Sequence, residues 1–425
     1  MPTLRVSLML LFLLVACLVT PASHAQTYSY TLLHTFTGVD GAVPAVNLTL
    51  DSADNIYGAA NSGGGSSECG TIFKIDKTGA FSVLYSFTGG ADGCNPEGGL
   101  LRYGGNIYGV AAGGGDGCPG GCGTIFQLNK KGILTPLYSF TGGTDGADPG
   151  FGLVRDPAGN FYGVTSQGGY LACDNGQGCG TVFQLDTSNQ LNVLYRFTGG
   201  PDGAIPFGEL IRDAAGNLYG NTEFGGDSNC VLFAESLAGC GTVFKLDSSS
   251  NLTVLHPFSG GADGAYPSAV IRAGSNLYGT TQYGGGSCFQ GTVTGCGVVF
   301  KIDGKHNLSV LHNFTGGADG AESDGGGDLV VGFGLTRDKA GNLYGATVLG
   351  GDLTCATGSG YGCGTVFMLD SDDNLAALYD FTGGTDGTPS FYGTDLVRDK
   401  AGNLYGVTYP FGDLNNMGTV FKVAP

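Results

Sequence analysis

Four short phrases return seven times along the chain in the same order, and this repetition restricts the fold more than any other feature. In the last recurrence they occupy residues 378–384, 396–399, 403–406 and 418–421. The phenylalanines that close the first phrase lie 51 to 67 residues apart and are Phe36, Phe87, Phe140, Phe197, Phe258, Phe314 and Phe381. A period of this size is typical of stacked or radial repeats, in which one unit cannot bury its apolar faces without neighbours.

Each phrase is a short run of Val, Leu, Ile, Phe, Tyr and Thr bounded by Gly, Asp, Asn or Ser, which is typical of a strand. No segment after the N-terminus has the apolar spacing of a long helix. Four strands in each of seven repeats predict an all-β fold, a seven-bladed β-propeller of four-stranded antiparallel blades. A β-solenoid is the alternative, but its coils are usually shorter than this period. Since strands are expected at 28–36 and 418–423, we expect the N- and C-terminal strands to share one blade.

Composition further restricts the kind of propeller and its partners. The 82 glycines fall at turns between the expected strands, and the absence of Trp excludes the Trp-Asp signature of WD-repeat propellers. The formal net charge is −18, with no basic stripe that could neutralise phosphates. We therefore expect no nucleic-acid partner.

The first 25 residues have the pattern of a secretory signal peptide. Arg5 precedes an apolar core at 6–19, and small residues lead to a cleavage site after Ala25. A lipid-modified Cys17 is the alternative, although the residues after it stay apolar. No later stretch is apolar enough to span a membrane. We expect a secreted or periplasmic monomer with a single propeller domain, residues 26–425.

Cysteine spacing supports export to an oxidising compartment. Twelve cysteines remain after Cys17, and ten of them form close pairs in the loop between the third and fourth phrases. Cys69 and Cys94 are the two left over and are predicted to bond each other. The expected disulfides are Cys69 to Cys94, Cys118 to Cys122, Cys173 to Cys179, Cys230 to Cys240, Cys288 to Cys296, and Cys355 to Cys363. A metal site is the alternative, but these loops contain no His.

Antiparallel connectivity predicts two different faces. The turns between the second and third phrases and between the fourth and first are tight, as at 156–160 and 186–190. The cysteine loops and the Phe-Thr-Gly-Gly-x-Asp-Gly linkers must share the opposite face. Long loops on a rigid scaffold usually bear the functional residues.

The recurring Asp-x-Ala-Gly-Asn-Leu-Tyr-Gly, Gly-Thr-Val-Phe-Lys-Leu-Asp and Phe-Thr-Gly-Gly runs resemble the GloVer tandem repeat of choice-of-anchor exported bacterial proteins. The resemblance covers essentially the whole mature chain. It implies export and brings no established activity or catalytic residues. A further resemblance, to propellers with a Gly-Leu-x-x-Asp inner strand, implies that the second phrase is innermost and that 28–36 is outermost.

The recurring histidines and arginines are expected to have structural roles rather than catalytic ones. His34, His256 and His312 share a strand position that is Tyr in other repeats, so they are interpreted as packing residues and His-dependent catalysis or zinc binding is disfavoured. Arginines recur at the end of the second phrase, where we expect pairing with the turn aspartates Asp156, Asp213, Asp338 or Asp399, or with the fourth-phrase acids Asp186, Asp247 and Asp370. An anion-binding ring around the axis is the alternative. The arginines are Arg102, Arg155, Arg212, Arg272, Arg337 and Arg398.

The Asp-Gly pairs of the linkers are interpreted as turn residues rather than metal ligands. The sixth linker differs because four acidic residues crowd into ten positions. A structural Ca²⁺ is the only cofactor that we consider, and its weak candidate ligands are Asp319, Glu322, Asp324 and Asp328.

Aromatic residues of the loops are the candidate binding residues, because exposed rings beside Asp and Asn suit stacking on sugars or gripping a peptide. Local packing against glycine-rich loops explains them equally well. They are Phe224, Tyr283, Phe411, Tyr170, Phe289, Tyr361, Tyr392 and Tyr409.

These features favour a secreted, non-enzymatic propeller that binds an extracellular polysaccharide or surface protein through its disulfide-stapled loop face. A carbohydrate-active enzyme, a glycosidase or lyase, is the first alternative, with Glu223 and Glu235 as the carboxylates to test. A structural protein of the cell envelope is the second alternative. No catalytic residue is assigned.

Overall fold

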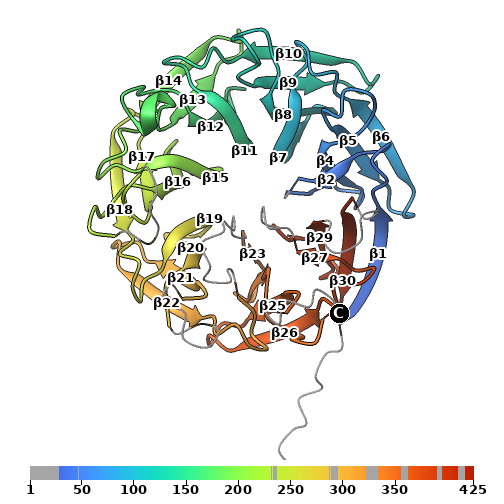
Figure 1. Ribbon diagram of the computed structural model, residues 1–425, viewed down its shortest axis with the longest axis vertical. Helices are drawn as coiled ribbons and strands as arrows, with labels where there is room; N and C mark the ends of the chain where they lie inside the picture. The colour runs from blue at the N-terminus through green and yellow to red at the C-terminus, as the bar shows by residue number, and fades with distance from the viewer. Residues whose placement is uncertain are drawn as a thin grey trace, which may run out of the picture.

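The computed structural model describes residues 28–45, 47–230, 232, 237–286, 288, 295–321, 334–355, 362–389, 395–409 and 417–425. In these residues seven antiparallel sheets surround a central axis like the blades of a propeller (Figure 1). The predicted seven-bladed β-propeller is therefore confirmed. The predicted signal peptide and Cys17 lie outside the described residues.

Each blade has four strand positions between the axis and the rim. The innermost strands are β2 (Ala42–Pro44) with β3 (Thr49–Leu50), β7 (Cys94–Tyr103), β11 (Ala147–Arg155), β15 (Ala204–Arg212), β19 (Ala265–Ala273), β23 (Thr336–Arg337), and β27 (Thr388–Pro389) with β28 (Val397–Arg398). The second strands are β4 (Ile56–Ser62), β8 (Asn106–Gly113), β12 (Phe161–Gln167), β16 (Leu218–Phe224), β20 (Asn276–Tyr283), β24 (Leu343–Ala346) and β29 (Leu404–Tyr409).

The outer half of each blade is more regular. The third strands are β5 (Thr71–Ile75), β9 (Thr124–Leu128), β13 (Thr181–Leu185), β17 (Thr242–Leu246), β21 (Val298–Ile302), β25 (Thr365–Leu369) and β30 (Thr419–Ala424). The outermost strands are β6 (Phe81–Ser86), β10 (Leu134–Ser139), β14 (Leu191–Arg196), β18 (Leu252–Pro257), β22 (Leu308–Asn313), β26 (Leu375–Asp380) and β1 (Ser29–Thr35). A short 3₁₀ turn, η1 (Asp174–Gly176), lies in one cysteine loop.

The two ends of the chain close the ring together. Strand β1 pairs antiparallel with β30, from Ser29 opposite Ala424 to Thr35 opposite Thr419. Figure 1 shows β1 on the rim and the second-phrase strands β7, β11, β15 and β19 around the axis. Both expectations about strand placement are confirmed.

Phenylalanine contacts between blades explain why two Phe positions repeat. The first-phrase Phe at the rim end of one blade meets the fourth-phrase Phe of the next blade edge to face, as in Phe140 and Phe183, whose ring centroids are 5.3 Å apart. Phe36 and Phe73 make the same contact at the closure, also at 5.3 Å. All four side chains have 0% exposure, so this repeated contact joins the blades through an apolar core.

A glycine in each second strand lets the same phenylalanine pack inward. Gly163 lies opposite Phe183 in the pairing of β12 with β13. A Cβ atom on Gly163 would lie 2.6 Å from Phe183 Cζ and 3.2 Å from Leu153 Cδ2. The Leu-Tyr-Gly phrase therefore ends in Gly because the ring of the neighbouring strand occupies the space of a side chain.

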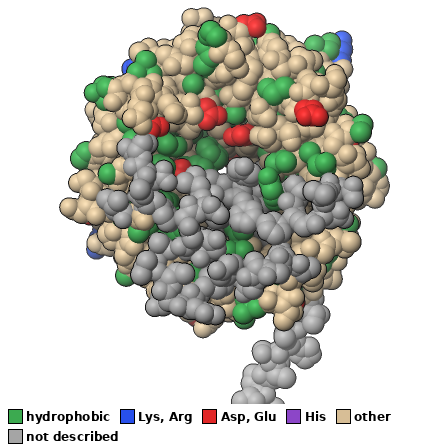
Figure 2. Space-filling view, viewed as in Figure 1, with side chains coloured by type: hydrophobic (Ala, Val, Ile, Leu, Met, Phe, Trp, Pro, Cys, Tyr) green, Lys and Arg blue, Asp and Glu red, His purple; other side chains and the backbone are tan. Residues whose placement is uncertain are grey.

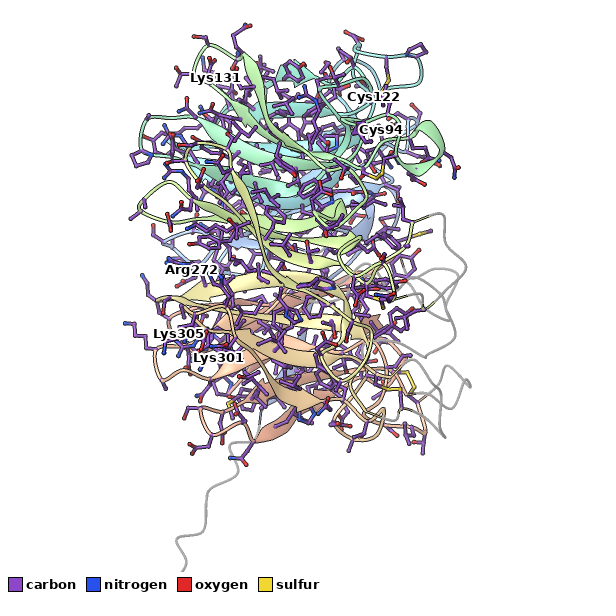
Figure 3. All side chains as sticks on the ribbon, turned by 90° about the vertical axis from the view of Figure 1, so that its left-hand side faces the viewer. Cys94, Cys122, Lys131, Arg272, Lys301 and Lys305 are labelled. Carbon is purple, nitrogen blue, oxygen red and sulfur yellow. A yellow bond between two sulfur atoms is a disulfide. The ribbon has the colours of Figure 1, made fainter. Side chains whose placement is uncertain are left out.

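The two faces of the propeller differ as the connectivity predicts. Cys94 and Cys122 lie on one face, and Lys131 and Lys305 lie on tight turns of the opposite face (Figure 3). We call the first the loop face, formed by the linkers and cysteine loops, and the second the turn face. The predicted separation of long loops from tight turns is confirmed for the described residues.

Candidate functional site

Disulfides staple the loop face. All six predicted pairs are present. The bond between Cys69 and Cys94 joins the first blade to β7, the innermost strand of the second blade. The linker glycines pack directly on the sulfur atoms. A Cβ on Gly199 would lie 2.4 Å from Cys173 Sγ, and one on Gly260 would lie 2.4 Å from Cys230 Sγ. The disulfides therefore hold the linkers as well as their own loops.

We expect removal of the bond between Cys69 and Cys94 by alanine at both positions to destabilise the fold by about 3 kcal/mol. Removal of the bond between Cys118 and Cys122 is the matched control and should cost about 2 kcal/mol. The reason is loop entropy, because the sequence separations are 25 and 4 residues. Guanidinium denaturation without reductant measures both losses. Equal losses would contradict this explanation.

The linker aspartates are turn residues with saturated carboxylates. Asp202 Oδ2 accepts hydrogen bonds from the Tyr195 hydroxyl at 3.1 Å and the Thr198 amide at 2.9 Å, and Oδ1 accepts from Thr198 Oγ1 at 2.5 Å. Where the repeat has His in place of Tyr, the imidazole ring makes the hydrogen bond to the linker aspartate instead, as in His256 Nε2 with Asp263 Oδ2 at 3.0 Å. Burial, followed by the charge of Asp202, raises the pKa of Tyr195 to about 12. The histidines, interpreted from the sequence as packing residues, thus also form hydrogen bonds with the linker aspartates.

Asp319, one of the four predicted Ca²⁺ ligands, follows the same pattern. Its carboxylate accepts from His312 Nε2 at 3.1 Å, the Thr315 amide at 3.0 Å and Thr315 Oγ1 at 2.5 Å. Glu322, Asp324 and Asp328 lie outside the described residues. A cation site in this linker stays a prediction, in which Asp319 would have to exchange its present partners for the metal.

Two of the candidate aromatic residues are not exposed. Phe224 is 5% exposed and Tyr283 is 0% exposed, and both pack beside Tyr266. The expectation that they present open rings is therefore wrong, because the strands β16 and β20 extend to these positions and turn them into the core. Tyr170 is 47% exposed and Tyr409 is partly buried. Phe289, Tyr361, Tyr392 and Phe411 lie outside the described residues.

The recurring arginines pack between blades. The guanidinium carbon of Arg212 lies 5.7 Å from the ring centroid of Tyr162 in the preceding blade, and that of Arg398 lies 5.3 Å from Tyr344. In the described part of the chain only Arg102 forms an ion pair, to Asp51 of the preceding blade at 3.1 Å.

The expected pairing within a repeat is wrong. Its proposed acceptor Asp156 instead accepts from Asn160 and from the Tyr162 hydroxyl at 3.0 Å. An Asp-x-Ala-Gly-Asn turn thus satisfies its own aspartate, which leaves the arginine to the neighbouring blade.

The axial channel contains carboxylates that the repeat pattern does not predict. Glu97, Asp148, Glu209 and Asp395 all lie on or beside the innermost strands and are only partly exposed. Figure 2 shows the loop face, with Asp and Glu side chains around its centre and Lys and Arg only near the outline. A signal was available for Glu209 and Asp395, because the equivalent position is Gly or Ala in four other repeats.

Two of these carboxylates lie near the loop end of their strands. Glu97 accepts a bond from Asn61 Nδ2 at 3.0 Å, and Asp148 accepts one from Ser166 Oγ at 2.5 Å. Burial raises the pKa of Glu97 to about 7, and the charge of Asp148 adds to the shift. Burial also raises the pKa of Asp148. Both shifts favour the protonated carboxyl groups.

The other two carboxylates lie deeper in the channel. Glu209 and Asp395 line a cavity of about 310 Å³ with Leu210, Val270 and Leu335. Burial raises the pKa of Glu209 to about 8, with a smaller contribution from the charge of Asp395, and raises the pKa of Asp395 to about 6. Of the catalytic pair considered from the sequence, Glu223 is 3% exposed and Glu235 lies outside the described residues.

The two faces of the propeller differ in charge. After Arg5 the chain has 17 lysines and arginines, and all but Arg196 lie on the tight turns or toward the turn ends of strands. Arg196 donates from Nε to the Thr144 carbonyl of a linker at 2.8 Å. The described linkers and cysteine loops are otherwise acidic or neutral, so the loop face has a negative potential.

Fold and site together define a disulfide-stapled seven-bladed β-propeller with an acidic loop face. The model of the Gloeobacter/Verrucomicrobia repeat matches residues 19–234, about half of the sequence. The chain belongs to this family of repeat proteins. No curated protein matches the sequence.

Solved structures show the same fold at low identity. The extracellular domain of a one-component system from B. thetaiotaomicron aligns at 10% identity with a TM-score of 0.53, covering 93% of this chain and 40% of that one. A puromycin hydrolase aligns at 11% identity with a TM-score of 0.54, covering 87% and 50%. This chain thus spans half or less of either structure, and the likeness concerns the fold alone.

The described residues contain no helix that is long and apolar enough to cross a membrane. The number of disulfides is consistent with an extracellular or periplasmic protein.

Proposed function

We propose that this chain is an exported, non-enzymatic binding propeller that holds an extracellular polysaccharide or surface protein on its loop face. The observation that carries the proposal is the contrast between the faces. One face has the stapled loops and a negative potential, and the other has tight turns and nearly all the cations. Stapled loops suit recognition because little conformational entropy is lost on binding.

Charge narrows the ligand class. An acidic polysaccharide would meet repulsion at the loop face, so an uncharged polysaccharide or a basic surface protein suits it better. Tyr170, 47% exposed, and its neighbour Leu171, 44% exposed, offer an apolar contact in a cysteine loop. They take the place of Phe224 and Tyr283 as the first contact residues to test.

Affinity electrophoresis of residues 26–425 through gels with uncharged or acidic polysaccharides tests the proposal. We expect retardation only in an uncharged gel, and Tyr170→Ala should weaken it about tenfold because one stacked ring is lost. Tyr103→Ala is the matched control, since Tyr103 is 53% exposed at a tight turn of the opposite face. Retardation by acidic polymers, or equal loss in both variants, would refute the proposed surface. The absence of retardation in any gel would move the proposal to a basic protein partner, tested by pull-down at low and high salt.

A carbohydrate-active enzyme is the second candidate. The pair of Glu97 and Asp148 favours it, because a carboxyl group with a raised pKa can act as the acid beside a second carboxyl group. New reducing ends or unsaturated ends in the eluted polysaccharide, lost in Glu97→Gln, would support the enzyme and replace the binding proposal.

A further inference from the structure

One ring of positions faces the axis of the propeller. These residues directly precede the second-phrase Leu or Val of each blade and are Asn47, Gly99, Gly152, Glu209, Ala269, Gly334 and Asp395. Four of the seven are Gly or Ala, and the other three have side-chain oxygen atoms. The small residues leave space on the axis, and the three oxygen-bearing side chains come from three different blades.

The three polar side chains converge. A Cβ atom on Gly99 would lie 3.3 Å from Glu209 Oε2 and 3.8 Å from Asn47 Nδ2, so both groups approach one point. Asn47 pairs with Asp395 in a parallel β-bridge and hydrogen-bonds its carboxylate. The Gly334 amide donates to Asp395 Oδ1. Glu209 and Asp395 line the same cavity.

The negative charge at this point has no matching cation among the described residues. Neither Glu209 nor Asp395 forms an ion pair there. Arg212 also lines the cavity, but its guanidinium lies beside Gly216 and donates to the Asp213 carbonyl at 3.5 Å, toward the turn face. Two unpaired carboxylates in one cavity repel each other unless protons or a cation compensate them.

Asn47 adds an independent observation. Its side chain is only 7% exposed, and its Oδ1 atom has no hydrogen-bond partner in the described part of the chain. A buried amide oxygen without a partner is costly, and such atoms usually have a ligand or an ordered water. The amide nitrogen of the same side chain faces the carboxylates and donates to Asp395, so a half-turn of the amide would bring Oδ1 to that point.

We propose that Glu209, Asp395 and Asn47 Oδ1 bind one Ca²⁺ ion in the axial channel. Two carboxylates and an amide carbonyl are hard oxygen ligands of the kind that Ca²⁺ takes, and the channel leaves room for water to complete six to eight ligands. The ion would neutralise the two charges and tie the first, fourth and seventh blades together. This site is separate from the loop-face surface and from the sixth linker.

Isothermal titration of CaCl₂ into chelator-treated residues 26–425 tests the site directly. We expect one bound ion per chain, displaced only weakly by Mg²⁺, and about 100-fold weaker binding in both Glu209→Gln and Asp395→Asn. Glu97→Gln and Asp324→Asn are the controls, because they remove a carboxylate near the loop end of the channel and one from the sixth linker, and both should bind as the parent does.

Thermal melting distinguishes a Ca²⁺-binding role of Glu209 from a purely structural role of its side chain. In chelator, Glu209→Gln should melt at or above the temperature of the parent chain, because it removes a partly buried acidic group whose ionised form is repelled by Asp395. With Ca²⁺ added, only the parent and the two controls should gain stability. A parent chain that binds no Ca²⁺ at millimolar concentration, or a Glu209→Gln variant that binds normally, would overturn the proposal. Loss of binding in Asp324→Asn alone would assign the ion to the linker instead.

Discussion

Replacement of Gly163 by Val should destabilise the propeller by about 3 kcal/mol or more, although both residues are small and apolar. The new Cβ would lie 2.6 Å from Phe183 Cζ, and Phe183 is wedged between Gly163 and Phe140 of the preceding blade. The ring cannot retreat without opening the contact between blades. Guanidinium denaturation followed by tyrosine fluorescence measures the loss.

Gly286→Val is the matched control because a Cβ there meets no atom of the described residues within 4 Å and Gly286 is exposed. Its effect should stay within about 0.5 kcal/mol. Phe183→Leu should partly rescue Gly163→Val, so that a double-mutant cycle gives a coupling energy of about 1 kcal/mol or more. Additive losses would mean that the glycine is required for another reason than the ring beside it.

The pH dependence of stability should change most clearly in Glu97→Gln. Burial and the charge of Asp148 raise the pKa of Glu97 to about 7 in the folded chain, against about 4.5 when unfolded. A carboxyl group with a raised pKa stabilises the fold fully below about pH 4.5, and this contribution is lost as the pH rises through 7. The parent should therefore lose roughly 2 to 3 kcal/mol across this window relative to the variant.

Denaturation midpoints at pH 4.5 and pH 8, with chelator present throughout, measure this difference. Glu68→Gln is the control, since Glu68 is exposed on the same face and should follow the parent at both pH values. Asp148 is the charged group that acts on Glu97, and Asn61 is its hydrogen-bond donor. Parallel curves for the parent chain and Glu97→Gln would mean that Glu97 is ionised at neutral pH in the folded chain.

Local information was enough for the architecture. Strand length, the order of the phrases and turn chemistry predicted seven blades, the closure of β1 on β30 and the two faces. The disulfides followed from counting, because ten cysteines pair within single loops and only Cys69 and Cys94 remain. These features depend on contacts between residues close in sequence or at a fixed period, which repetition makes visible.

The repeat pattern did not predict the directions in which individual side chains point. Phe224 and Tyr283 stand at the ends of strands, and whether such a ring points outward depends on where the strand stops. The arginines were assigned to aspartates of their own repeat, whereas Arg212 and Arg398 lie over tyrosines of the preceding blade. The first error depends on where a strand ends and the second on contacts between blades, and periodicity resolves neither.

The sequence by itself determined the fold and the division of charge between faces, because the phrases and the cations recur at set places in the repeats. It also determined the covalent cross-links, because a cysteine precedes the fourth phrase in six of the seven repeats. Only the tertiary structure decided which carboxylates meet. Asn47, Glu209 and Asp395 are more than 150 residues apart from one another in the chain and come together on the axis. Closure of the ring places one position of every blade around a single line, and no local pattern within one repeat contains that convergence.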